Sequence, residues 1–149
     1  MKAFAFLTTL MLLFSFSQTA CSQQTPASGV ENNGSKIEKP IMAFEKKMHD
    51  FGVVTLGDNP TYTYKFVNKG NADLKIEIVS GCDCTKIVWP EGKTFKPGEG
   101  GEITITFLTE KEEEKGVLDK TIDILLENVD PETGYPMMEE LKYMVDYKG

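Results

Sequence analysis

The sequence of 149 residues contains no arginine, one histidine, one tryptophan and three cysteines. All 16 basic residues are lysines, and 23 acidic residues give a formal net charge of −7. Nucleic-acid-binding proteins neutralise phosphates with clustered lysine and arginine, so this composition argues against a nucleic-acid partner. The sequence also lacks GxSxG, P-loop, HExxH and GxGxxG motifs. No nucleophile–base pair stands out, so we do not expect an enzyme.

The longest apolar run, from Phe4 to Phe16, is shorter than the roughly 20 residues that a membrane-spanning helix needs. It follows a positively charged start and precedes Ala20 and Cys21, the order found in secretory signals. The segment is similar to a bacterial lipoprotein signal, in which the cysteine becomes the new N-terminus and carries the lipid. We therefore expect residues 1–20 to be a signal peptide and Cys21 to be lipidated. The protein would then be anchored to a membrane of the cell envelope, in the outer membrane or facing the periplasm. The alternative is ordinary cleavage near Ala20, with Cys21 unmodified.

Residues 21–40 are rich in serine, glutamine, asparagine, glycine and proline and contain few aliphatic side chains. Such a segment buries too little apolar surface to offset the entropy lost on ordering. We expect it to be a flexible tether, which leaves residues 41–149 as one folded domain.

The folded part alternates between apolar and polar residues. Between Thr61 and Asn68, the side chains of Tyr62, Tyr64 and Phe66 share one face, which is the pattern of a half-buried strand. Residues that favour turns separate the alternating segments. The pattern predicts seven to eight short strands, around residues 42–44, 51–54, 61–68, 74–80, 84–89, 103–107, 118–126 and 141–147.

This succession of strands without a helical stretch indicates an all-β fold of two antiparallel sheets packed face to face. The first strand, around residues 42–47, and the last, around 141–147, are candidate sheet edges for partner binding. The charged run from Glu110 to Lys115 is expected to be a solvated loop. Lys120 lies between apolar residues of a strand, so we expect it at a sheet margin, with its stem on apolar surface.

Several short motifs follow one another along the chain: His49-Asp50-Phe51-Gly52 with Val54, Phe66-x-Asn68-x-Gly70, Leu74-x-Ile76, Ser80 to Thr85, Lys96 to Glu99, Phe107, and Gly116-x-Leu118-x-Lys120-x-Ile122. Their order resembles the bacterial DUF1573 family, a domain of unknown function frequent in Bacteroidetes lipoproteins. That family is similar to the immunoglobulin-like domains of the major sperm protein, PapD and ASPM/SPD-2/Hydin type. The resemblance covers about residues 43–147 and implies an immunoglobulin-like sandwich with no assigned catalytic role. The family usually has Cys-Gly-Cys where this chain has Cys82-Asp83-Cys84.

Three states are open for Cys82 and Cys84. An oxidising compartment favours a disulfide. Residues i and i+2 of an extended strand lie about 6.6 Å apart, so a bridge needs a tight turn. As thiolates, the pair would bind a soft metal such as copper or zinc, with further ligands from His49 or a methionine. As free thiols, they would be small, partly buried hydrophobic residues. The methionines considered are Met42, Met48, Met137, Met138 and Met144.

From these features we expect a non-catalytic binding or assembly module of the cell envelope, lipid-anchored, with a protein partner bound at sheet edges and loops. The alternative is a protein that handles thiol redox chemistry or a soft metal through Cys82 and Cys84.

Overall fold

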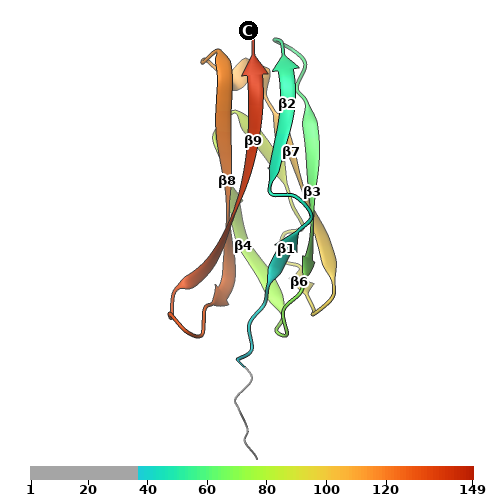
Figure 1. The fold of residues 1–149 in the computed structure, drawn as a ribbon, viewed down its shortest axis with the longest axis vertical. Coiled ribbons are helices and arrows are strands. Elements are labelled where there is room, and N and C mark those ends of the chain that lie inside the picture. Colours follow the sequence, from blue (N-terminus) through green and yellow to red (C-terminus); the bar gives the residue numbers. More distant parts are fainter. Residues whose placement is uncertain (1–36) are drawn as a thin grey trace, which may run out of the picture. The chain divides into compact units, whose positions relative to one another are not determined.

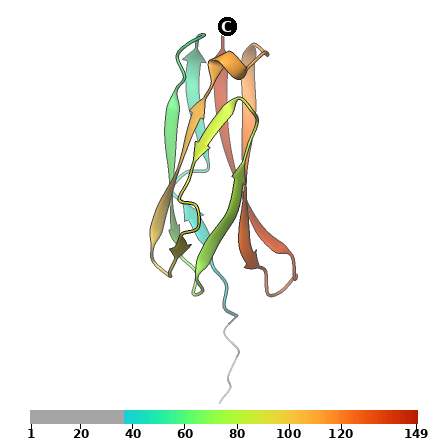
Figure 2. The ribbon, with the colours of Figure 1, turned by 180° about the vertical axis from the view of Figure 1, so that it is seen from behind.

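Residues 37–149 are described by a computed structural model, and they form nine strands and one short 3₁₀ helix arranged as two packed sheets (Figures 1 and 2). The four-stranded sheet has the order β1-β3-β7-β5, and the five-stranded sheet has the order β2-β9-β8-β4-β6. Within this part of the chain, no helix has the length and apolar character needed to cross a bilayer. The elements are β1 (Met42–Phe44), β2 (Met48–Val54), β3 (Thr61–Asn68), β4 (Leu74–Ser80), β5 (Thr85–Val88), β6 (Thr94–Phe95), β7 (Gly100–Phe107), η1 (Thr109–Lys111), β8 (Gly116–Val129) and β9 (Pro136–Tyr147).

The all-β sandwich predicted from the alternating pattern is confirmed, with one difference in strand direction. β1 pairs with β3 in antiparallel fashion, and the chain then crosses to the other sheet, where β2 pairs with β9 in parallel. The other strand pairs are antiparallel. One N-terminal stretch therefore contributes a strand to each sheet.

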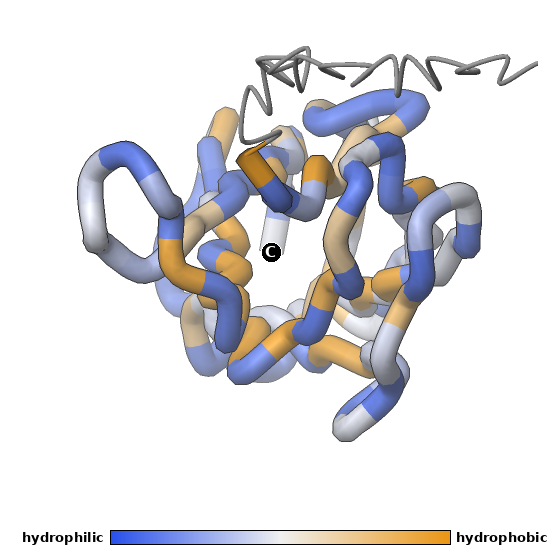
Figure 3. Tube along the Cα trace, turned by 90° about the horizontal axis from the view of Figure 1, so that it is seen from below, coloured by the Kyte–Doolittle hydropathy of each residue, from blue (hydrophilic) through white to orange (hydrophobic). Residues whose placement is uncertain are grey.

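The hydrophobic core lies between the sheets and consists of the inward-facing residues of both. Hydrophilic and hydrophobic residues alternate along the strands (Figure 3), and the inward positions are almost fully buried. Two core tyrosines place their hydroxyl groups at acceptors across the sandwich. Tyr64 in β3 donates to the carbonyl of Lys142 in β9 (2.8 Å), and Tyr147 in β9 donates to the carbonyl of Thr109 in η1 (2.9 Å). Each buried hydroxyl thereby avoids the cost of an unpaired polar group.

Asn68, at the end of β3, is fully buried and its amide makes four hydrogen bonds. Its Oδ1 accepts from the backbone N–H of Ile41 (3.2 Å) and of Gly70 (3.0 Å). Its Nδ2 donates to the carbonyls of Ala72 (2.8 Å) and Phe95 (2.9 Å). The side chain therefore joins the segment before β1, the β3–β4 turn and β6.

The domain begins before residue 41, because part of the predicted tether packs on it. Pro40 is buried, and the backbone of Lys39 exchanges hydrogen bonds with Asn71 at 2.8 and 3.1 Å. The ammonium of Lys39 also forms an ion pair with Asp130. A Cβ atom on Gly70 would overlap the backbone of Lys39 and Ile41, so glycine at this position permits the close approach.

The prediction that residues 141–147 form a sheet edge is wrong, whereas β1 does lie at an edge. This half of β9 is paired with β2 on one side and with β8 on the other. The parallel pairing with β2 places it inside the sheet, and the sequence of β9 alone carries no sign of that pairing.

We predict that Asn68→Ala lowers the free energy of unfolding by about 3 kcal/mol, because it leaves buried backbone groups without partners. Urea unfolding followed by circular dichroism measures the loss. Asn128→Ala is the matched control, since Asn128 also makes two hydrogen bonds to backbone, with Lys75 (3.0 Å) and Asp73 (2.9 Å), but at the surface. Its loss should be about 1 kcal/mol or less. Equal losses for the two variants would contradict the assigned role of Asn68.

Candidate functional site

The Cys82–Cys84 segment connects β4 in one sheet with β5 in the other. The N–H of Thr85 donates to the carbonyl of Cys82 (2.9 Å), which closes a tight turn and leaves the Cα atoms of the two cysteines 5.1 Å apart. The structure joins Cys82 and Cys84 by a disulfide, one of the three states considered from the sequence. The turn provides the shortening that an extended strand would not allow.

A chain of hydroxyl groups connects this disulfide to the core. Thr85 Oγ1 lies 3.2 Å from Cys82 Sγ, 3.9 Å from Cys84 Sγ and 2.5 Å from the hydroxyl of Tyr143. Tyr143 is fully buried, and burial raises the pKa of its hydroxyl, although the hydrogen bond with Thr85 acts in the opposite direction. Tyr143 is therefore neutral at physiological pH and holds Thr85 beside the sulfur atoms.

The two cysteines differ in exposure. Cys84 is 4% exposed and belongs to the core, whereas Cys82 is only partly buried. Both line a shallow pocket of about 350 Å³. Because the bridge closes a loop of only three residues, it restricts the unfolded chain much less than a long-range disulfide would, by about 1.5 kcal/mol in the loop-entropy model.

Residues 111–114 form the opposite wall of this pocket, and the charged run from Glu110 to Lys115 is exposed, as predicted, except at Glu112. The side chain of Glu112 is 6% exposed and that of Lys120 is 17% exposed, and their charged atoms lie 2.6 Å apart. Burial by itself raises the pKa of Glu112. Lys120 and the backbone N–H groups of Glu114 and Glu113 together lower the pKa by more than burial raises it, so the pKa lies below its ordinary value of 4.5. Lys120 is half-buried in β8, which lies inside the five-stranded sheet and not at the margin that the sequence predicted, and Glu112 is its partner.

His49, the metal ligand suggested by the sequence, lies in β2 within an aromatic cluster. Its ring stacks on Tyr62 with centroids 3.6 Å apart and an interplanar angle of 11°, and it meets the edge of Phe51 at 4.6 Å. Burial lowers the pKa of His49. Within residues 37–149, no group of three histidine, cysteine or acidic side chains is arranged to hold a metal ion. The structure therefore does not bring His49 together with Cys82 and Cys84. Cys21 lies outside the described residues.

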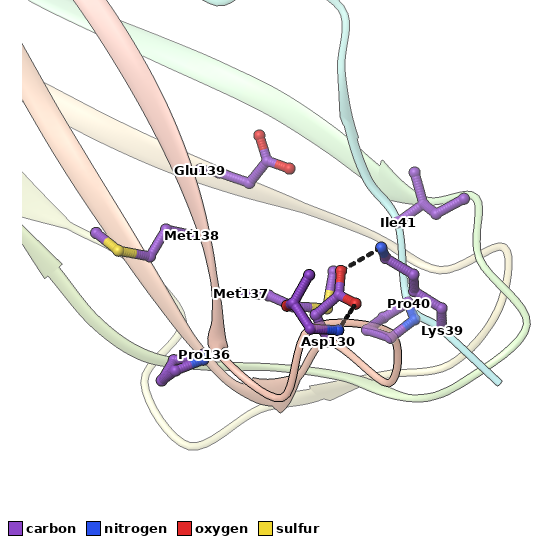
Figure 4. Close-up of a pocket in the computed structure, with 9 residues that line it drawn as sticks. Lys39, Pro40, Ile41, Asp130, Pro136, Met137, Met138 and Glu139 are labelled. Carbon is purple, nitrogen blue, oxygen red and sulfur yellow. Dashed lines mark hydrogen bonds and ion pairs between the residues drawn. The ribbon is translucent and has the colours of Figure 1, made fainter. Parts of the chain in front are cut away.

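A second pocket, of about 360 Å³, lies between the segment before β1 and the start of β9 (Figure 4). No motif in the sequence indicates it. Ile41 lies on one side, and Met137 and Glu139 point toward the gap from β9, whereas Met138 points to the other face of the sheet. Ile41 is 51% exposed and Met138 is 63% exposed. The ion pair of Lys39 with Asp130 closes one end of the pocket.

We predict that Glu112→Gln lowers the free energy of unfolding by about 2 kcal/mol at pH 7, because it leaves the Lys120 charge without its partner. The folded-state pKa of Glu112 is below its ordinary value of 4.5. The stabilisation is therefore complete above pH 4.5 and is lost as the pH falls through the lowered value. Urea unfolding at pH 7 and at about pH 3 should show a difference from wild type that shrinks in acid. Glu113→Gln, an exposed neighbour in the same loop, is the control and should change little at either pH. A loss that persists undiminished in acid would exclude the charge as its cause.

Comparisons with known proteins agree with this architecture. Among solved structures, a protein of unknown function from Porphyromonas gingivalis W83 is similar, with 18% sequence identity and a TM-score of 0.59. The match covers 73% of this chain and 47% of that one, so this chain spans about half the length of that protein. The PapD-like domain 7 of human CEP192 is 12% identical with a TM-score of 0.53, over 71% of this chain and 84% of that one. The YadV chaperone is 14% identical with a TM-score of 0.50, over 72% of this chain and 52% of that one.

At these identities the likeness concerns the fold, which is immunoglobulin-like. No curated protein matches the sequence significantly. The model of the family described as "Protein of unknown function (DUF1573)" matches residues 42–137, well over half of the chain, and confirms the resemblance seen in the order of the motifs. The chain therefore belongs to the DUF1573 family.

Proposed function

We propose that this protein is a non-catalytic binding or assembly module of the cell envelope, lipid-anchored through Cys21, that holds an extended segment of a partner protein against a sheet edge. The observation that supports this most directly is the free side of the first half of β9, residues 136–141, beside the pocket of Figure 4.

The free side of β9 follows from the register of its neighbours. β2 pairs with β9 only from Lys142 onward, whereas β8 pairs with β9 along most of the length of β9. The N–H of Lys142 donates to the carbonyl of Lys47, on the β2 side. Because N–H groups point to alternate sides along a strand, those of Glu140 and Met138 point to the same side, where the described residues supply no strand. An added strand would find donors and acceptors there.

The pocket beside this edge offers a seat for an apolar side chain. Ile41 and Met137 provide apolar surface, and flexible methionine side chains adapt to differently shaped partners. Lys47 forms an ion pair with Glu139 (2.5 Å), so the edge has charged groups around an apolar centre. Backbone pairing would supply affinity and the pocket selectivity for an extended segment with apolar residues at alternate positions.

The known neighbours are consistent with this role without establishing it. YadV, described as a chaperone, shares the fold, and pairing of an extended segment with a sheet edge is a recognition mode open to such a domain.

We predict that Met138→Pro weakens partner binding about tenfold, because proline has no N–H to donate and its ring obstructs an added strand. The complex would lose one or two backbone hydrogen bonds, which corresponds to a factor of about ten in affinity. The N–H of Met138 points away from β8, so the existing ladder should persist. The measurement is recovery of co-purifying envelope proteins with the tagged full chain. Met138→Ala keeps the N–H and separates the contribution of the backbone from that of the side chain. Unchanged recovery with Met138→Pro, in a variant that unfolds like wild type, would rule out binding at this edge.

The lipid anchor is tested separately. We predict that Cys21→Ala moves the protein from the membrane fraction to the soluble fraction, because each buried methylene of an acyl chain contributes about 0.8 kcal/mol to membrane binding. Fractionation after expression in the native type of cell gives the distribution, and mass spectrometry gives the acyl mass on residue 21. Ser22→Ala should remain in the membrane fraction. If wild-type protein is found in the soluble fraction with Cys21 unmodified, ordinary signal cleavage near Ala20 is favoured over lipidation.

A further inference from the structure

The Cys82–Cys84 disulfide is poorly suited to a purely structural role. It spans two residues in sequence, so it ties together no distant parts of the chain. The turn that contains it is already closed by the backbone hydrogen bond from Thr85 to Cys82. It also lines a surface pocket instead of lying wholly in the core. Stabilisation of the fold therefore does not account for the presence of this disulfide.

We propose that Cys82 and Cys84 form a thiol–disulfide exchange site whose substrate is a disulfide of a partner protein, with Cys82 as the exchanging sulfur and Cys84 as the resolving sulfur. The difference in exposure assigns the roles. Cys82 is only partly buried and reaches the pocket, whereas Cys84 is 4% exposed and packs in the core. A bulky partner therefore reaches Cys82 first.

Thr85 provides the group that would stabilise a thiolate at Cys82. Its hydroxyl lies 3.2 Å from Cys82 Sγ and 3.9 Å from Cys84 Sγ. When Tyr143, at 2.5 Å, donates to Thr85 Oγ1, the proton of Thr85 is available to Cys82. A hydrogen bond to a thiolate favours the reactive form of the nucleophile.

The charges around the pocket set the direction of electron transfer. Two ammonium groups, on Lys111 and Lys120, share the pocket with four carboxylates, on Asp83 and residues 112–114. Excess negative charge disfavours thiolates and so destabilises the reduced pair relative to the disulfide. A pair whose disulfide is favoured gives up its electrons readily, so the site is suited to reducing a partner's disulfide.

The reaction balances as two exchange steps. The Cys82 thiolate attacks one sulfur of the partner's disulfide, forming a mixed disulfide and releasing the other partner sulfur as a thiolate. The Cys84 thiolate then attacks Cys82 Sγ, forming the bridge seen in the structure and releasing the second partner sulfur. Two electrons pass to the partner, whose two thiolates take up protons that the two cysteines gave to solvent. A dithiol reductant returns Cys82 and Cys84 to the thiol state by the reverse exchange.

The test uses the full chain with Cys21→Ser, so that Cys82 and Cys84 are the remaining cysteines. The probe is 2-hydroxyethyl disulfide, which carries no charge. With Cys84→Ser, mass spectrometry should show a stable adduct on Cys82, formed about tenfold faster than the adduct of Cys84 in the Cys82→Ser variant. With both cysteines present, the reduced protein should return to the intramolecular disulfide without accumulating adduct.

Two controls separate exchange from simple exposure. Lys86→Cys in a chain with both Cys82 and Cys84 replaced by serine places a thiol on the exposed side of β5, and it should react more slowly than Cys82. Thr85→Val in the Cys84→Ser chain should slow the reaction of Cys82 and shift its pH–rate profile to higher pH, because the hydroxyl is lost at nearly constant shape. Far-ultraviolet circular dichroism checks that each variant is folded.

Two results would overturn the proposal. One is equal reactivity of Cys82 and Cys84 in the single-cysteine chains. The other is a bridge that dithiothreitol reduces only after the protein has been unfolded in urea, because an exchange site must react in the native state.

Discussion

The position of one sheet on the other is fixed by tyrosine hydroxyl groups that must find partners inside an apolar core. Tyr64, Tyr143 and Tyr147 reach across the sandwich to Lys142, Thr85 and Thr109. Sliding one sheet by a residue would leave these buried hydroxyls unpaired, at a cost of about 1–3 kcal/mol each. Apolar side chains alone would tolerate more than one packing, so the hydroxyl pairs select a single arrangement. Through Tyr143, that arrangement also sets the place of Thr85 beside the Cys82–Cys84 bridge.

The strands were predictable where one face of a strand is buried. Thr61–Asn68 and Leu74–Ser80 have the predicted bounds, because alternation of apolar and polar residues follows directly from the two-residue period of a strand. β9 begins at Pro136, before the predicted residue 141. Its first half lacks a neighbour on one side, and its inward positions, Met137 and Glu139, are only half-buried, so the sequence shows no apolar–polar alternation there. β6 has two residues, which is too short for any periodicity. The parallel pairing of β2 with β9 joins residues far apart in sequence, and no local pattern encodes it.

The candidate sites were predictable in their residues but not in their surroundings. Cys82 and Cys84 are conspicuous in the sequence, but the bridge depends on a turn that brings their Cα atoms to 5.1 Å. Glu112 was hidden in a charged run, where one carboxylate among several cannot be distinguished by composition. The available signal was Lys120, which lies between Leu118 and Ile122 on the inward face of β8, since a lysine there needs an anionic partner. Lys39 was assigned to the tether for a similar reason, because its partner Asp130 is distant in sequence.

The strand β9 carries features of both proposed activities, yet its structure keeps them independent. Its first half has the free edge and the pocket lined by Met137, whereas Tyr143 lies in the half that is paired on both sides. The free edge is beside the β8–β9 connection, and the disulfide pocket includes the loop after η1, at the other end of the sandwich (Figure 1). A segment that pairs with residues 136–140 would add hydrogen bonds without displacing β2 or β8. Because Tyr143 is held by those two neighbours, its contact with Thr85 would be unchanged, and a partner bound at the edge would leave Cys82 as accessible as before.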